Sequence, residues 1–130
     1  MKYFTLEELL LLHFKIVEDY GGSHGVRDEG RLESAIAAPQ QVVFGVELYS
    51  SVYEKAATYA RAIVADHPLV DGNKRTAITS ATIFLHRQGM VLKASPKELE
   101  DFAVKIAVEH LDVPMIAAWF KAHSKKAAQR

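Results

Sequence analysis

Residues 67–76 bring acid–base, anion-binding and metal-binding side chains together in one short segment. His67 can act as a general base, because a neutral imidazole with a pKa of about 6.5 accepts a hydroxyl proton near pH 7. Asp71 offers a hard carboxylate oxygen of the kind that binds Mg²⁺, often together with substrate phosphates. Because core segments rarely carry such residues, this stretch predicts a chemical site.

The residues after Asp71 have the features of a phosphate site. Gly72 permits a tight turn, and a helix that begins at Asn73 or Lys74 would direct its free N–H groups and the positive end of its dipole at the loop. A lysine and an arginine add positive charge, and the guanidinium can hold phosphate oxygens bidentately. The predicted nucleotide and phosphate contacts are therefore Gly72, Asn73, Lys74 and Arg75.

These residues also have ordinary structural interpretations. A simple turn between two helices explains a proline and a glycine, but not the polar residues together. Taken singly, His67 is compatible with a turn residue, Asp71 with a cap on the following helix, and Lys74 with a solvated charge. Thr76 is left outside the predicted site, because a threonine one turn into a packed helix more often bonds its own backbone. The other histidines lack metal-ligand spacing and are interpreted as surface or helix-end residues: His13, His24, His86, His110 and His123.

The order of residues is more specific than their types. Residues 67–75, His-Pro-Leu-Val-Asp-Gly-Asn-Lys-Arg, resemble the Fic/Doc family signature His-Pro-Phe-x-(Asp/Glu)-Gly-Asn-(Gly/Lys)-Arg. Upstream, the segments Gly-Val-Arg-Asp at 25–28 and Leu-Glu-Ser-Ala at 32–35, with Pro39, resemble the death-on-curing (Doc-like) toxin subgroup. The similarity is close over residues 25–89 and looser over 4–120.

The resemblance implies a toxin of a toxin–antitoxin system. Such a protein transfers a phosphate from a nucleoside triphosphate such as ATP to a Ser/Thr hydroxyl of a protein target, with a translation elongation factor as one candidate target. It implies that His67 is the catalytic base, that Asp71 is the Mg²⁺ ligand, and that the phosphate contacts are those named above. Arg27 and Asp28 would brace the loop. Residues 40–49 would form a flap that aligns the target peptide, although a packing loop fits the same sequence.

Two departures from the family pattern bear on the reaction. Leu69 replaces the usual phenylalanine, and another apolar anchor should serve there. Ile78 stands where Fic AMP-transferases carry a second arginine, which favours phosphate transfer over the alternative, AMP transfer. A catalytically silent helical module that binds a partner is a further alternative. An RNA-cleaving toxin is the least favoured, because it would ordinarily need a more basic surface.

The sequence also predicts how the enzyme is restrained. Many Fic relatives inhibit themselves through a helix that reads (Ser/Thr)-x-x-x-Glu-(Gly/Asn). The Glu29-Gly30 pair of this chain has Gly25 at the required Ser/Thr position, so the motif is not formed. We therefore expect a small antitoxin that inhibits in trans, through an amphipathic segment that folds on binding near the site.

The surrounding elements are predicted to be helices. Capping boxes at residues 5–8 and 51–54 begin helices that end near residues 20 and 66. The helix from about residue 73 to residue 87 is apolar or small on nearly every face, which predicts the central and most buried helix. Further helices are expected at residues 31–37, from Ser95-Pro96 and from about Pro114. The predicted fold class is all-α, a compact Fic-fold bundle of about six helices with a short flap or hairpin.

Composition limits the remaining possibilities. The chain of 130 residues fits one Fic/Doc domain spanning 1–130, and its formal net charge of zero does not favour a nucleic-acid partner. Zero cysteines exclude a disulfide framework and thiolate metal sites. We expect a cytoplasmic protein without a membrane partner, because neither a signal peptide nor an apolar membrane span is recognisable. The basic residues from about 122 to 130 are expected to form a frayed tail.

Overall fold

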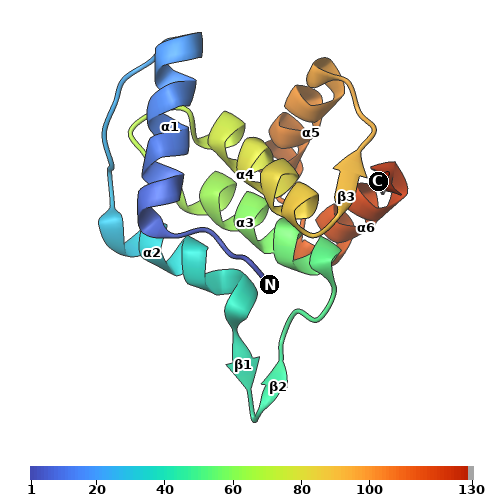
Figure 1. Ribbon diagram of the computed structural model, residues 1–130. Coiled ribbons are helices and arrows are strands. Elements are labelled where there is room, and N and C mark those ends of the chain that lie inside the picture. The colour runs from blue at the N-terminus through green and yellow to red at the C-terminus, as the bar shows by residue number, and fades with distance from the viewer. Residues whose placement is uncertain (129–130) are drawn as a thin grey trace.

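The computed structural model describes residues 1–128, within which the chain forms six α-helices and two small strand pairs (Figure 1). The helices are α1 (Leu6–Tyr20), α2 (Glu29–Ala37), α3 (Val52–Asp66), α4 (Asn73–Arg87), α5 (Pro96–Glu109) and α6 (Val113–His123), with a 3-10 turn, η1, at Ala38–Gln40. Antiparallel pairs join β1 (Val42–Val43) to β2 (Val46–Glu47) and β3 (Met90–Leu92) to β4 (Ser124–Lys126). The predicted all-α class is confirmed. In this described part, none of the helices has both the length and the apolarity that crossing a membrane requires.

Local capping begins the helices where the sequence predicts. In the three boxes headed by Thr5, Ser51 and Ser95, the hydroxyl accepts a hydrogen bond from the N–H of the glutamate three residues later, at 3.1 Å in each case. Asp28 caps α2 by accepting from the Arg31 N–H, so this helix begins two residues earlier than expected. These bonds satisfy N–H groups that a helix leaves free at its start.

The core lies around α3 and α4, which pack side by side between α1 and α2 on one side and α5 and α6 on the other (Figure 1). α4 occupies the central position predicted for it, but it is not the most buried helix. On α3 every residue from Lys55 to Ala60 is buried, together with Ile63 and Val64. The reason is that α3 contacts α2, η1, α4, α5 and α6, and its alanines allow close approach.

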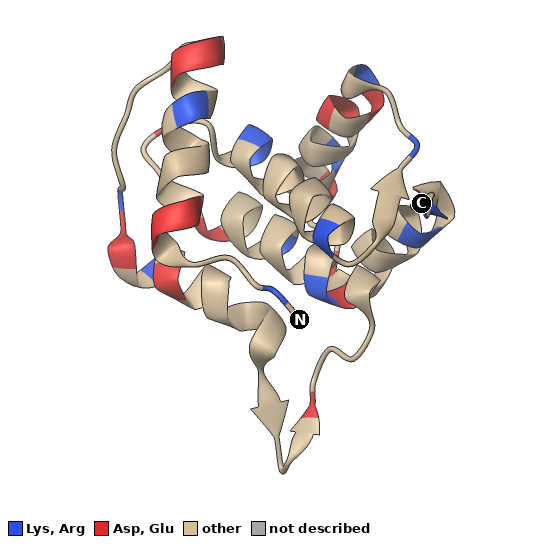
Figure 2. Ribbon diagram, in the orientation of Figure 1, with Lys and Arg blue, Asp and Glu red and all other residues tan. Residues whose placement is uncertain are grey.

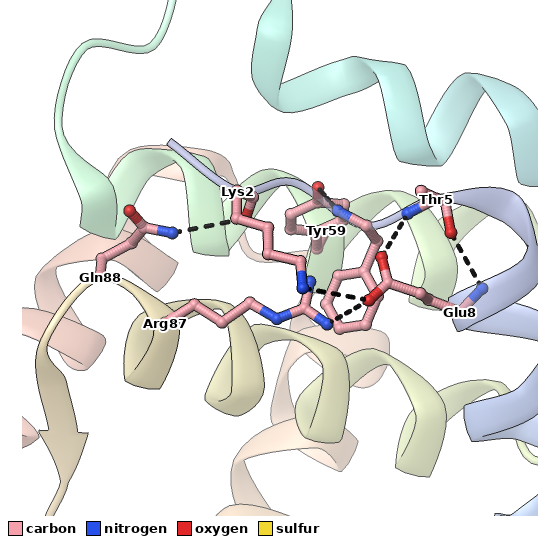
Figure 3. Close-up of polar contacts among 7 residues, drawn as sticks. Lys2, Thr5, Glu8, Tyr59, Arg87 and Gln88 are labelled. Atoms are coloured by element: carbon pink, nitrogen blue, oxygen red, sulfur yellow. Dashed lines mark hydrogen bonds and ion pairs between the residues drawn. The ribbon is translucent and has the colours of Figure 1, made fainter.

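The N-terminal segment ties α1 to the end of α4 (Figure 3). Arg87 pairs with the Glu8 carboxylate, with 2.6 Å between Nη2 and Oε2, and its guanidinium lies 4.5 Å above the Phe4 ring. The Phe4 N–H donates to the Tyr59 hydroxyl at 3.1 Å, and burial raises the pKa of that hydroxyl to about 12. Since Tyr59 belongs to α3, three helices meet at this point.

The segment at 42–47, predicted as a loop or flap, is an exposed hairpin that projects from the helical body (Figure 1). Its root is fixed by Lys55, whose side chain is only 1% exposed; the Nζ donates to the Pro39 carbonyl at 3.2 Å and pairs with Glu47 at 3.1 Å. The tip residue Phe44 is fully exposed and has a φ of 50°. The interpretation as a covered packing loop is therefore wrong, whereas the flap role stays a prediction.

The prediction of a frayed tail is wrong for residues 122–126. α6 continues to His123, and β4 then pairs with β3 in the register Met90 with Lys126 and Leu92 with Ser124. The Ala127 N–H also donates to the Gly89 carbonyl at 2.8 Å. Lysine-rich segments can form edge strands, and composition alone did not reveal this pairing. Residues 129–130 of the predicted tail lie outside the described part.

Candidate functional site

Residues 67–72, here called the motif loop, join α3 to α4 and border a cleft of about 790 Å³. The walls of the cleft come from the C-terminal half of α1, the first turns of α4 and the N-terminal half of α5. All of the predicted site residues line it: His67, Asp71, Gly72, Asn73, Lys74 and Arg75. This volume lies within the usual range of pockets that hold small molecules and cofactors.

Backbone contacts from residues 25–28 hold the outer side of the motif loop. The N–H groups of Arg27 and Asp28 both donate to the Pro68 carbonyl, at 2.8 and 3.0 Å, and the Val70 N–H donates to the Gly25 carbonyl at 3.0 Å. The predicted bracing role of Arg27 and Asp28 is confirmed. These contacts use the main-chain N–H groups of Arg27 and Asp28, and not their side chains.

His67 ends α3 in the left-handed conformation, with φ of 46° and ψ of 56°. A non-glycine residue in this region carries backbone strain, and such strain is often found at functional sites. The conformation turns the chain sharply out of the helix. It leaves His67 exposed at the border of the cleft.

Asp71 is held at three atoms. Its Oδ1 accepts from the Gly72 N–H at 2.9 Å, and its Oδ2 accepts from the Ser23 N–H at 3.1 Å. Its carbonyl oxygen lies 2.8 Å from Nε2 of His13. The Gly72 N–H is the backbone group that precedes α4, so Asp71 stands next to the cap position without filling it.

The side chain of Asn73 closes the motif loop. Its Oδ1 accepts from the Leu69 N–H at 3.0 Å, and its Nδ2 donates to the Leu69 carbonyl at 2.9 Å. Both ends of the amide are thus occupied within the protein. Leu69 itself is 1% exposed and is the apolar anchor expected at this position. The backbone N–H of Asn73, in the first turn of α4, remains suited to an anion.

The first turn of α4 has the electrostatics of an anion site. Gly72, the cap residue, has a φ of 73° and provides no side-chain hydrogen bond, and no acidic residue lies in this turn. Figure 2 shows basic residues at this end of the helix. Lys74 is exposed, while the Arg75 guanidinium lies 3.8 Å above the Tyr20 ring, a contact that orients it beside the cleft.

His13 is one of the residues beside the site that the sequence does not predict. The sequence places it among surface or helix-end residues, but it lies within α1, is 4% exposed and contacts the motif loop at Asp71 and Gly72. A signal was present, because His13 falls on the same helical stripe as the buried Leu9, Ile16 and Val17. The stripe predicts that His13 is buried, but it does not predict that its hydrogen-bond partner is Asp71.

The residues fit a magnesium ion held jointly with a nucleotide. Among residues 1–128, no three His, Cys, Asp or Glu side chains are grouped to hold a metal by themselves. Mg²⁺ is usually bound by one or two protein carboxylates, and substrate phosphates and water supply its other ligands. The single exposed carboxylate of Asp71 therefore suffices as the protein ligand. After accepting two N–H groups, its carboxylate retains free lone pairs, since it has about four.

Comparison with known proteins identifies the family of the chain. Residues 3–85 match the model of the Fic/DOC family. Toxin Doc of Mycolicibacterium smegmatis is 42% identical over 101 residues, covering 76% of this chain and 78% of that protein. Protein kinase doc of Escherichia phage P1 is 38% identical over 117 residues, covering 90% of this chain and 91% of that protein. The chain belongs to the Fic/DOC family.

Proposed function

We propose that this protein is a Doc-like toxin that transfers the γ-phosphate of ATP to a Ser/Thr hydroxyl of a protein target. The single observation that carries the proposal is the cleft in which His67 and Asp71 lie beside the uncapped, basic start of α4. The names of the two relatives, a toxin and a protein kinase, support the same assignment.

In this proposal the start of α4 binds the terminal phosphates. The free backbone N–H groups of Asn73, Lys74 and Arg75 and the helix dipole favour an anion at this position. The Lys74 ammonium and the Arg75 guanidinium add charge, and the guanidinium can hold two phosphate oxygens at once. Together these groups would stabilise negative charge on the phosphoryl group during its transfer.

His67 acts as the general base. The target hydroxyl oxygen forms a bond to the γ-phosphorus, the bond from that phosphorus to the bridging oxygen breaks, and ADP leaves. The hydroxyl proton goes to the His67 imidazole. Asp71 would hold Mg²⁺, which when bound neutralises charge on the phosphates. This transfer step requires no general acid in the cleft.

Ile78 favours phosphate over AMP as the transferred group. AMP transfer releases pyrophosphate, and a second arginine at this position would neutralise its charge. Ile78 is 6% exposed, lines the cleft and cannot neutralise charge. Lys74 adds a compact charge next to the terminal phosphoryl and leaves less room for an α-phosphate with its ribose.

The proposed partners follow from this activity. We assign the target to the protein-synthesis machinery, with a translation elongation factor as the candidate, and the site of action to the cytoplasm, where ATP is available. The segment at residues 25–30 does not form the self-inhibitory motif. A small antitoxin is therefore proposed to inhibit in trans, through an amphipathic segment that folds into a groove near the cleft.

Labelled nucleotides test the transferred group. Purified protein is incubated with a cell lysate and ATP labelled at either the γ- or the α-phosphate, and the modified protein is examined by mass spectrometry. We expect label from the γ-position alone and a mass gain of one phosphate, both lost with His67→Ala. A mass gain of one adenylate with α-label would replace this proposal with AMP transfer. No transfer from either label would favour a silent binding module.

A further inference from the structure

We infer that α1 and the segment after it form a clamp that positions Asp71, and that His13 is a positioning residue of the site. The inference rests on the proposed role of Asp71 in holding Mg²⁺ with the nucleotide. It does not depend on whether phosphate or AMP is transferred. The clamp consists of two contacts with Asp71: His13 at the carbonyl oxygen and Ser23 at the carboxylate.

The first contact fixes a peptide plane. The C=O of Asp71 and the N–H of Gly72 belong to one planar unit, so they rotate together. The Asp71 carbonyl lies 2.8 Å from Nε2 of His13, and the Gly72 N–H donates to Asp71 Oδ1 at 2.9 Å. The orientation of the carboxylate is therefore coupled, through this plane, to the buried imidazole.

Without a donor at position 13 the plane would be free to rotate. Gly72 adopts a φ of 73° and, lacking a Cβ, tolerates the other orientation at little cost. Rotation would remove the Gly72 N–H from the carboxylate and redirect the backbone just before the first turn of α4. One substitution would thus disturb both the carboxylate and the adjacent phosphate-binding backbone.

The second contact explains why a glycine occupies position 22. The Ser23 N–H donates to Asp71 Oδ2 at 3.1 Å, and a Cβ built on Gly22 would lie 2.7 Å from that same oxygen. The neighbouring Gly21 also has a positive φ, of 85° against 108° for Gly22, but a Cβ there would meet nothing within 4 Å. The chain thus provides a matched pair of positions: both carry backbone strain when substituted, and only one touches Asp71.

The test uses Mn²⁺ as a spectroscopic substitute for Mg²⁺ and measures its affinity in the presence of ADP by electron paramagnetic resonance. His13→Met fills the volume without a donor, whereas His13→Gln retains an amide donor near the position of Nε2. We expect His13→Met to weaken Mn²⁺ binding about tenfold, as is typical when a residue supporting a metal ligand is removed. His13→Gln should restore most of that affinity, and Gly22→Ala should weaken it while Gly21→Ala does not.

Four results would overturn the clamp: wild-type affinity in His13→Met, an equal defect in His13→Gln, an equal effect of the two glycine substitutions, or no Mn²⁺ binding by the wild-type protein. If His13→Met does not fold, the comparison of Mn²⁺ affinity between Gly22→Ala and Gly21→Ala tests the clamp. Failure of the proposed function would show differently, as transfer of AMP or of nothing by a wild-type protein whose Mn²⁺ affinity still responds to the clamp variants.

Discussion

The Asn73 amide hydrogen-bonds both main-chain groups of Leu69, accepting from its N–H at 3.0 Å and donating to its carbonyl at 2.9 Å. The asparagine of the motif is thereby a structural residue as well as a proposed phosphate contact. It fixes the spacing between the end of α3 and the start of α4, and hence the position of the residues between them.

This relationship predicts a stability effect. Asn73→Ala leaves both Leu69 groups without their partner and should lower the free energy of unfolding by about 1–3 kcal/mol. The adjacent Lys74 is exposed, so Lys74→Ala is the control and should change the free energy by less than about 0.5 kcal/mol. Urea unfolding measures both. Equal stability of Asn73→Ala and the wild type would contradict the closing role of the amide.

A second prediction separates chemistry from structure at His67. His67→Ala should retain the fold, since the side chain is exposed, while the transfer rate falls roughly 10²–10⁴-fold and growth arrest is lost. His110 is the matched control, because it ends α5 in the same left-handed conformation, with φ of 50°, and does not line the cleft. His110→Ala should remain toxic and active. Continued growth arrest by His67→Ala would remove His67 from the mechanism.

A third prediction concerns stability at acid pH. The Thr5 N–H first, and then the Arg87 guanidinium, hold the pKa of Glu8 below its ordinary value of 4.5. The Glu8 carboxylate therefore binds a proton more readily in the unfolded chain than in the folded one. The stabilisation by ionised Glu8 is complete above pH 4.5 and is lost as the pH falls through the lower pKa of the folded state. We expect a loss of about 0.5–1 kcal/mol over this interval.

Glu8→Gln tests this pH dependence, because glutamine can keep the capping box while losing the charge. Unfolding by urea is measured between pH 3 and pH 7. Glu8→Gln should be less stable than the wild type near pH 7 and should approach its stability at pH 3. Glu7 is exposed, so the control variant Glu7→Gln should show the same dependence of stability on pH as the wild type. A constant difference between Glu8→Gln and the wild type at every pH would show that the charge contributes nothing.

Much of the fold could be predicted because its signals are local. A hydroxyl and a glutamate three residues later, as in Thr5 with Glu8, begin a helix whatever surrounds it. The candidate site could be predicted for a similar reason. The residues from His67 to Arg75 are contiguous, so a turn followed by a helix places them in one cleft. Their chemical types then indicated an anion site with a base.

What the sequence determined by itself was therefore the set of helices, their caps and the chemistry of one segment. The tertiary structure decided the contacts between distant positions: His13 with Asp71, Lys55 with the root of the hairpin, and β3 with β4. Helical periodicity shows that a residue such as His13 faces inward, but its partner depends on how helices pack, which involves residues far apart in the chain. The same limit applies to Asn73, whose amide could serve a ligand or a loop until the position of Leu69 was known.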